Sequence, residues 1–187
     1  VASGNRQSLS AAVAAGMLAV GDEHGGAGSL AMELIAEGAR RAEAEGISLA
    51  TAAERAVAEA RAQGRRLPGL GHRVHATDPR VAVLFELARE HGIAAGGVAY
   101  MQALEAAARA QIKPLPLNID GALAALLFDM GFAAAAGKLL FLVGRAAGLS
   151  AEVAEEYERE KPMRIRIPVA YDGEPARELD GDLPAKG

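Results

Sequence analysis

The stretch that decides how this chain is interpreted is PGLGHRV at residues 68–74, followed by DPR at residues 78–80. The glycines beside His72 let a backbone approach a ligand closely, and a histidine can donate or accept a proton near neutral pH. Arg80 offers a planar fork that suits a carboxylate or a phosphate. The Asp-Pro pair before it has the pattern of an N-cap and a first helical residue. These residues predict a site for an anionic substrate that is polarised by proton donation.

Composition excludes several classes of function. The 187 residues carry a formal net charge of −4, which gives no general electrostatic reason to bind DNA or RNA. The chain has no cysteine, which excludes disulfides and thiolate metal sites and fits a cytoplasmic protein. No apolar run reaches the roughly 18–20 residues that span a bilayer, and we recognise no signal peptide. We therefore expect no partner among nucleic acids or membranes.

Apolar patterning predicts helices along almost the whole chain. Half the residues are hydrophobic but only 4% are aromatic, so alanine and leucine supply most of the apolar volume, which favours closely packed helices. Capping residues precede many apolar segments and glycine follows them. The fold class expected is all-α, although the alternation at residues 164–167 is typical of a short strand. The expected helices cover residues 10–20, 29–45, 51–64, 79–91, 98–112, 121–130, 138–147 and 150–161.

Three polar side chains interrupt the apolar pattern where loops meet helices: His24, His72 and Asp120. Each also has a purely structural interpretation. His24 could be a surface turn residue in its glycine-rich loop, and Asp120 could be an N-cap, the usual role of an aspartate before an apolar helix. His91 lies at an expected helix C-terminus, where the dipole favours a cation, and is interpreted as structural.

Taken together, the motifs have the order and approximate spacing of the citrate synthase superfamily, including its lyase-type members that act on citryl-CoA. The chain resembles this family over about residues 8–175. The resemblance implies a two-lobed, all-α fold with the active site in the cleft between the lobes. The matching elements are HGGA at 24–27, PGLGHRV at 68–74, DPR at 78–80, NID at 118–120, FLVGRAAG at 141–148 and, more weakly, Arg166 five residues before Tyr171.

The resemblance also implies a role for each polar side chain. Asp120 would remove a proton from the methyl group of acetyl-CoA, and His24 would hydrogen-bond the thioester oxygen and stabilise the enol or enolate. His72 would bind and polarise the carbonyl group of oxaloacetate and donate a proton to that oxygen. Further residues would bind the two substrates: Arg80, Arg145 and Arg166 the dicarboxylate, and Gly69, Leu70, Gly71 and Arg73 coenzyme A.

The same resemblance implies how the chain is organised. Residues 1–26 and 136–187 would belong to the larger lobe, and residues 27–135 would form the smaller lobe. Family members are typically homodimers, in which Arg166 would reach the partner's site. Coenzyme A thioester would be a substrate and no cofactor is expected; the four histidines also lack the spacing of metal ligands. Because family members extend further upstream, we expect the chain to be truncated at its N-terminus.

Departures from the family pattern leave alternatives open. Arg80 lies eight residues after His72, where the family usually has one residue more. Residues 121–123, Gly-Ala-Leu, replace an aromatic residue that often follows the aspartate. Their small size would leave room for an extra methyl group, as in a 2-methylcitrate synthase that uses propionyl-CoA. The short chain favours a citryl-CoA lyase over a citrate synthase. A non-catalytic paralogue or partner subunit that binds CoA or a carboxylate, and a helical interaction module in which the motifs are accidental, are the remaining alternatives.

Overall fold

The computed structural model describes residues 1–6, 8–22, 24–168 and 170–174. The all-α fold expected from the sequence is confirmed. Within the described residues, no helix is both long and apolar enough to cross a membrane. The helices are α1 (Leu9–Leu18), α2 (Ala27–Glu45), α3 (Leu49–Ala62), α4 (Pro79–Glu90), α5 (Gly96–Gln111), α6 (Ile119–Asp129) and α7 (Ala135–Arg159).

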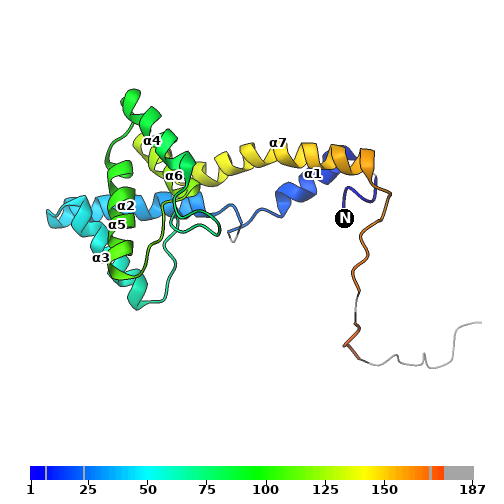
Figure 1. Ribbon diagram of the computed structural model, residues 1–187, viewed down its shortest axis with the longest axis horizontal. Helices are drawn as coiled ribbons and strands as arrows, with labels where there is room; N and C mark the ends of the chain where they lie inside the picture. Colours follow the sequence, from blue (N-terminus) through cyan, green and yellow to red (C-terminus); the bar gives the residue numbers. More distant parts are fainter. Residues whose placement is uncertain (7, 23, 169, 175–187) are drawn as a thin grey trace, which may run out of the picture.

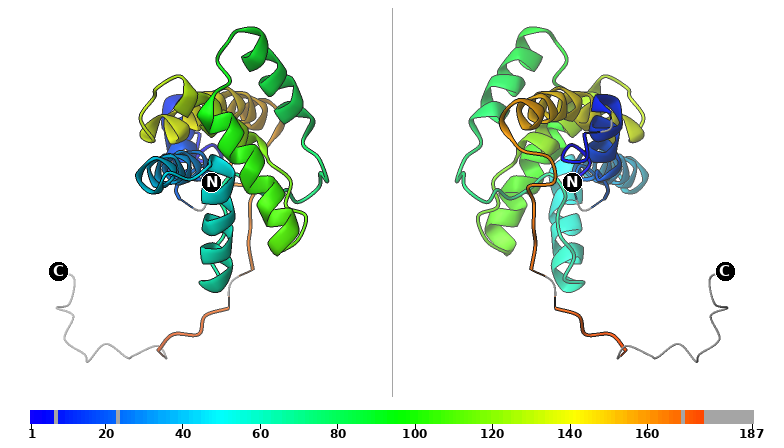
Figure 2. Two further views of the ribbon diagram at one scale, coloured as in Figure 1. Left: turned by 90° about the vertical axis from the view of Figure 1, so that its left-hand side faces the viewer. Right: turned by 90° about the vertical axis from the view of Figure 1, so that its right-hand side faces the viewer.

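Helices α2 to α6 form one body, and α1 and α7 lie side by side and extend away from it (Figure 1). The N-terminal part of α7 joins the body, where this helix packs against α2 and α6. Helix α4 packs chiefly against α6 and stands apart from the other helices of the body (Figure 2). The loop that carries His24 connects α1 to α2, at the junction of the two parts.

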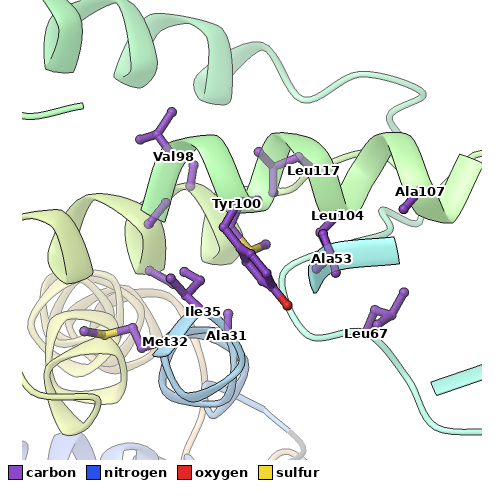
Figure 3. Close-up of a cluster of buried hydrophobic side chains, with 14 of the residues drawn as sticks. Ala31, Met32, Ile35, Ala53, Leu67, Val98, Tyr100, Leu104, Ala107 and Leu117 are labelled. Atoms are coloured by element: carbon purple, nitrogen blue, oxygen red, sulfur yellow. The ribbon is translucent and has the colours of Figure 1, made fainter. Parts of the chain in front are cut away.

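The core of the body is made of small and medium-sized side chains. Its largest fully buried members include Tyr100, Met101 and Leu104 of α5 and Met32 and Ile35 of α2. Figure 3 shows the Tyr100 ring extending from α5 toward α2. Alanines of α2, α3, α5 and α6 fill most of the remaining core. Since alanine occupies little volume, these helices approach one another closely, as the composition indicates.

Gly38 of α2 and Gly137 of α7 permit especially close contacts between helices. A Cβ atom at Gly38 would lie 2.1 Å from the ring of Tyr100, so only glycine accommodates that ring. A Cβ atom at Gly137, near the start of α7, would lie 2.5 Å from the backbone of Gly28. Helix α7 therefore begins directly against the backbone of α2, and a side chain at Gly137 would separate these two helices.

Helices α2 and α3 both begin two residues earlier than predicted. The residues predicted at their starts, 29 and 51, make other hydrogen bonds instead of capping a helix. Helix α2 begins at Ala27, and the Ser29 hydroxyl accepts a hydrogen bond from the backbone N–H of Lys138 in α7 at 3.0 Å. Helix α3 begins at Leu49, because the Ser48 hydroxyl caps it by accepting a hydrogen bond from the N–H of residue 51 at 3.0 Å. The N-cap of α2 is Gly26, which makes no side-chain cap, whereas in α3 sequence reasoning chose residue 51 over the true cap, Ser48.

The C-terminal part of the chain departs further from the prediction. Residues 138–147 and 150–161 belong to one continuous helix, α7, and the Ser150 hydroxyl donates a hydrogen bond to Ala146 O at 2.8 Å instead of capping a new helix. No strand forms at residues 164–167 or elsewhere in the described residues. Arg164 pairs instead with Glu156 of α7 at 2.6 Å.

Candidate active site

Two loops that are distant in the sequence are held together by backbone hydrogen bonds. Gly71 N donates to Pro116 O at 2.7 Å, and Asn118 N donates to Gly69 O at 3.0 Å. The Asn118 side chain adds a third bond, from Nδ2 to Gly71 O at 2.8 Å. The loop that carries the PGLGHRV motif is therefore fixed to the start of α6, which carries Asp120.

The same two segments touch through a pair of glycines. Gly69 has a φ of +83°, and a Cβ atom at this position would lie 2.7 Å from Gly121 Cα. A Cβ atom at Gly121 would lie 2.5 Å from Gly69 O. Both contacts are to backbone, so no side-chain movement could relieve them, and Ala122 beside them is fully buried. The small residues after Asp120 are therefore packed, and the extra space expected beside them is already filled.

Asp120 is the second residue of α6 and does not cap the helix. Asn118 is the N-cap, and its Oδ1 accepts a hydrogen bond from Gly121 N at 3.1 Å. The Asp120 side chain is half-buried, and burial raises its pKa, whereas the positive charges of Arg80 and His24 act to lower it. The fold therefore brings α4 and the α1–α2 loop close to a carboxylate whose affinity for a proton is raised.

Asp78 and Arg80 form a tight pair at the start of α4. Asp78 is the N-cap, as predicted, and its Oδ1 accepts a hydrogen bond from Arg80 N at 3.1 Å. The same carboxylate accepts from Arg80 Nε at 2.9 Å and from Nη2 at 2.7 Å. These bonds lower the pKa of Asp78 to about 2, although burial opposes the effect. One edge of the Arg80 fork is therefore held by Asp78, and the edge formed by its two Nη atoms is left for a substrate.

His72 is exposed, and its loop fixes the position of the imidazole proton. Nδ1 accepts hydrogen bonds from Val74 N at 3.1 Å and from His75 N at 2.9 Å. A neutral imidazole has one donor and one acceptor nitrogen, so the proton of neutral His72 lies on Nε2. The positive charge of His72 acts to lower the pKa of Asp78, which places this ring near the pair that starts α4. His72 therefore offers an N–H donor at the site.

His24 and Arg145 contact the same aromatic ring from different elements. The His24 ring meets Phe141 of α7 edge-on, with 5.6 Å between the ring centroids, and Arg145 Cζ lies 5.0 Å from the centroid of Phe141. Backbone hydrogen bonds between His24 and Gly21, at 3.1 Å in each direction, hold the turn. Sequence reasoning did not select Phe141 as a site residue; its signal was the spacing of four residues from Arg145, which puts both on one helix face.

An open cavity of about 590 Å³ lies beside these loops, with walls from residues 65–70, from residues 112–118 and from the start of α2. Arg65, Arg66 and Lys113 line it together with apolar side chains that include Leu30 and Leu70. Cations beside apolar walls suit a ligand with an apolar arm and an anionic end. Sequence reasoning missed these three cations, although two of them, Arg65 and Arg66, lie within three residues of the start of the PGLGHRV motif.

The four residues predicted to bind coenzyme A do not all lie at the cavity. Gly69 and Leu70 line the cavity. The N–H of Leu70 donates to Leu67 O at 3.3 Å, and that of Gly71 donates across to the 116–118 segment, so neither amide is available to a ligand in this arrangement. Arg73 is exposed and lies outside the described lining of the cavity.

Arg166 is not brought to the other site residues of its own chain. It follows Arg164, which pairs with Glu156, fifteen residues along α7 from Phe141. At about 1.5 Å per residue, this separation is roughly 22 Å along the helix axis. The segment after α7 also leaves from the end of the helix that points away from the body (Figure 1). Among the residues described, no three histidine, aspartate or glutamate side chains are grouped to hold a metal ion.

Comparison with known proteins agrees with this architecture. The family described as "Citrate synthase, C-terminal domain" matches residues 1–166. The chain belongs to the citrate synthase family. It is 33% identical over 127 residues to the citrate synthase of Haloferax volcanii, a match that covers 66% of this chain and 32% of that protein. The chain therefore spans about a third of the length of this citrate synthase.

Two solved structures of citrate synthase relatives are similar to this chain. Citryl-CoA lyase from Hydrogenobacter thermophilus gives a TM-score of 0.79 and 37% identity, with coverage of 95% of this chain and 68% of the lyase. Citrate synthase from Thermotoga maritima gives a TM-score of 0.64 and 27% identity, with coverage of 85% of this chain and 42% of the synthase.

Proposed function

We propose that this chain belongs to an enzyme that forms or cleaves the carbon–carbon bond between oxaloacetate and the methyl carbon of acetyl-CoA, with citryl-CoA on the other side of the reaction. The observation that carries the proposal is the half-buried carboxylate of Asp120, on which the charges of Arg80 and His24, from separate segments, both act. The identity of 37% with the citryl-CoA lyase of Hydrogenobacter thermophilus supports the same class of chemistry.

Proton abstraction is the first step in the condensing direction. Asp120 accepts a proton from the thioester methyl group, and its raised pKa makes it a stronger base than an exposed aspartate. The negative charge that develops on the thioester oxygen needs a donor, which the imidazole of His24 supplies. A donor preorganised in this way typically contributes about 100- to 1,000-fold to the rate.

Carbon–carbon bond formation is the second step. The enolate carbon attacks the carbonyl carbon of oxaloacetate, and His72 Nε2–H hydrogen-bonds the carbonyl oxygen as it becomes the hydroxyl oxygen of citryl-CoA. His72 gives its Nε2 proton to this oxygen, and the proton held by Asp120 returns to His72 through solvent, so that overall one proton moves from the methyl group to the new hydroxyl group. In the cleaving direction the same bonds break in reverse order. The hydrogen bonds to Nδ1 from residues 74 and 75 keep the donor on Nε2 in both directions.

The carboxylates of the four-carbon acid bind to two arginines. Arg80 presents its Nη edge while Asp78 holds the other edge, so the fork is oriented before the substrate arrives. Arg145 is oriented by its contact with Phe141. Positioning of this kind reduces the entropy lost on reaching the reactive geometry, a contribution of several kcal/mol in well-oriented reactions.

The thioester substrate occupies the cavity of about 590 Å³ beside the PGLGHRV loop. Its apolar walls accommodate the pantetheine arm, and the cations Arg65, Arg66 and Lys113 accommodate the phosphates. Coenzyme A takes part here as a substrate, and no metal or other cofactor has a role in this proposal.

We also infer that the enzyme acts as a homodimer in the cytoplasm. Apolar side chains on α1 and α7 are exposed, including Leu18 at 86% and Val143 at 71%, and such faces favour association with a second copy. In the dimer, Arg166 of one subunit completes the carboxylate clamp of the other. Sedimentation velocity tests the dimer, and cell fractionation tests the location.

Mass spectrometry of the products tests the reaction and its direction. The chain is mixed with oxaloacetate and acetyl-CoA, and separately with citryl-CoA. We expect acetyl-CoA and oxaloacetate from citryl-CoA without citrate, because the chain is 37% identical to the citryl-CoA lyase and 27% identical to the citrate synthase of Thermotoga maritima. Citrate with free CoA would instead identify a synthase that hydrolyses citryl-CoA.

Asp120→Asn should abolish turnover while the thermal unfolding curve is unchanged, and Asp172→Asn, at an exposed position, is the matched control. Equal turnover in Asp120→Asn and the unsubstituted chain would contradict the mechanism. If neither mixture reacts but CoA stabilises the chain against heat, the binding-only paralogue replaces the enzyme as the conclusion.

A further inference from the structure

The backbone segment 116–118 is held by hydrogen bonds on two sides. Pro116 O and Asn118 N both bond to the PGLGHRV loop, at 2.7 Å and 3.0 Å. Leu117 forms an antiparallel bridge with Leu70 between these two bonds, so its own N–H points away from that loop. This N–H donates to Oε1 of Glu105, in α5, at 3.0 Å. Glu105 is therefore the second support of the segment that leads to Asp120.

The register of α5 places Glu105 beside the core. Leu104 and Ala108 of this helix are fully buried, and Glu105, between them, is half-buried. Leu104 and Leu117 belong to one cluster of buried side chains (Figure 3). In the described part of the chain, no lysine, arginine or histidine nitrogen lies within 4.0 Å of the Glu105 carboxylate. Ion pairing therefore does not explain the carboxylate, whereas its bond to Leu117 N does.

The segment that Glu105 supports connects two parts of the candidate site. On one side, Asn118 Nδ2 donates to Gly71 O at 2.8 Å, directly before His72 in the sequence. On the other side, Asp120 follows Asn118 at the start of α6. Leu117 is only 4% exposed, so solvent offers its N–H no ready replacement for the Glu105 oxygen. Loss of that oxygen would leave a buried donor unpaired and allow the whole segment to shift.

We propose that Glu105 is a positioning residue for the reaction, because its bond to Leu117 N fixes the segment that sets Asp120 and the His72 loop relative to each other. This inference rests on the proposed function and adds a residue that the mechanism above does not use. Glu105 acts through the backbone. It lies outside the described lining of the cavity beside the PGLGHRV loop, and the charges that act on the Asp120 carboxylate come from other parts of the chain.

Three variants separate the hydrogen bond from the charge and from the helix. Glu105→Met removes the acceptor but keeps a long side chain that favours helix. Glu105→Gln keeps an oxygen acceptor and removes the charge, so the acceptor alone distinguishes it from Glu105→Met. Gln102→Met introduces the same side chain at an exposed position of α5 and is the matched control.

Steady-state kinetics on these variants tests the positioning role, with turnover expressed per folded molecule as measured by circular dichroism. Because a misplacement of about 1 Å can cost about 100-fold in rate, we expect Glu105→Met to lower kcat about 10- to 100-fold. The KM for the thioester should change less than about 2-fold, since Glu105 does not line the cavity. Glu105→Gln should keep kcat within about 3-fold, because only the charge assistance of the bond is lost.

Two kinetic results would overturn the proposal. In the first, Glu105→Met keeps the kcat of Gln102→Met, and Glu105 then only stabilises the fold. In the second, Glu105→Gln loses as much kcat as Glu105→Met, and the charge of Glu105 is then responsible instead of its bond to Leu117 N.

Amide hydrogen exchange, measured by NMR without substrate, tests the same contact independently of turnover. Glu105→Met should raise exchange at Leu117, and also at Gly71 and Asn118, by about 10-fold or more, whereas Gln102→Met should not. Unchanged exchange at Gly71 and Asn118 overturns the positioning role whatever the kinetics show. If the unsubstituted chain turns over neither substrate mixture, the proposed function fails, and exchange alone decides whether Glu105 holds the two segments together.

Discussion

Replacing Asp78 by asparagine should remove a stabilising contribution that depends on pH in a defined range. In the structure one carboxylate caps α4 and binds the Arg80 guanidinium through both oxygens. Asparagine preserves the shape and one oxygen acceptor, but its NH2 group would face Arg80 Nη2, where a donor meets a donor. The variant therefore loses the charge and one hydrogen bond while it keeps an N-cap of similar strength.

The size of the effect follows from the pKa of Asp78. Hydrogen bonds from Arg80 lower it from an ordinary 3.8 to about 2, against the opposing effect of burial. Each pKa unit corresponds to about 1.4 kcal/mol, so the ionised carboxylate contributes about 2 kcal/mol to the free energy of unfolding. Because the folded-state pKa is the lower one, this contribution is complete above pH 5 and is lost as the pH falls from about 4 to about 2.

Urea denaturation followed by circular dichroism, at several pH values between 7 and 2.5, measures this contribution. We expect Asp78→Asn to be about 2 kcal/mol less stable at pH 7, with the difference shrinking below pH 4. Other carboxylates titrate in the same range, but they cancel in the difference between the two proteins. Parallel stability curves down to pH 2.5 would refute the assignment of the ion pair, and so would an equal stability at pH 7.

Three further substitutions test the junction between the loops and the cavity beside the PGLGHRV loop. Gly121→Ala should destabilise the chain by about 1–3 kcal/mol in urea denaturation, because its Cβ would lie 2.5 Å from the backbone oxygen of Gly69. A loss under about 0.5 kcal/mol would contradict this packing. Asn118→Ala removes the helix cap and the bond to Gly71, and should cost about 1–3 kcal/mol and reduce turnover by more than the stability loss explains. Arg66→Ala should weaken coenzyme A binding in calorimetry and reduce the dependence of that binding on salt. Arg61→Ala, a control outside the described lining of the cavity, should change neither. Equal salt dependence in both variants would show that Arg66 does not bind the phosphates.

Local sequence signals predicted the helices better than their ends. Asp78-Pro79 placed the start of α4 correctly, because the capping bond and the proline preference act within one turn. Ser150 was misread as a cap, because a serine in a helix can instead donate to the carbonyl four residues earlier. Tertiary contacts decide between these uses, as the bond from Lys138 N to Ser29 does at the start of α2.

The polar residues of the candidate site could be predicted from sequence motifs. The contacts between distant segments and the cavity that they form could not. His24, Asp120 and Arg80 were selected from the motifs, and the charges of His24 and Arg80 both act on the Asp120 carboxylate in the structure. The space expected beside Gly121 is filled by Gly69, which is 52 residues away in the sequence, so no local pattern reveals that contact. The cavity was missed for the same reason, since its walls come from three segments.

The NID motif assigns helix capping and proton abstraction to two different residues, because a single aspartate could not perform both. A capping aspartate directs its carboxylate to the N–H groups of its own helix, which lowers its pKa and occupies its oxygens. Here Asn118 accepts the hydrogen bond from Gly121 N, so Asp120, two residues later, keeps its carboxylate outside the cap. The positive charges of Arg80 and His24 favour the ionised form of Asp120, but burial outweighs them and raises its pKa. An amide at the cap thus leaves the carboxylate that follows it as a base.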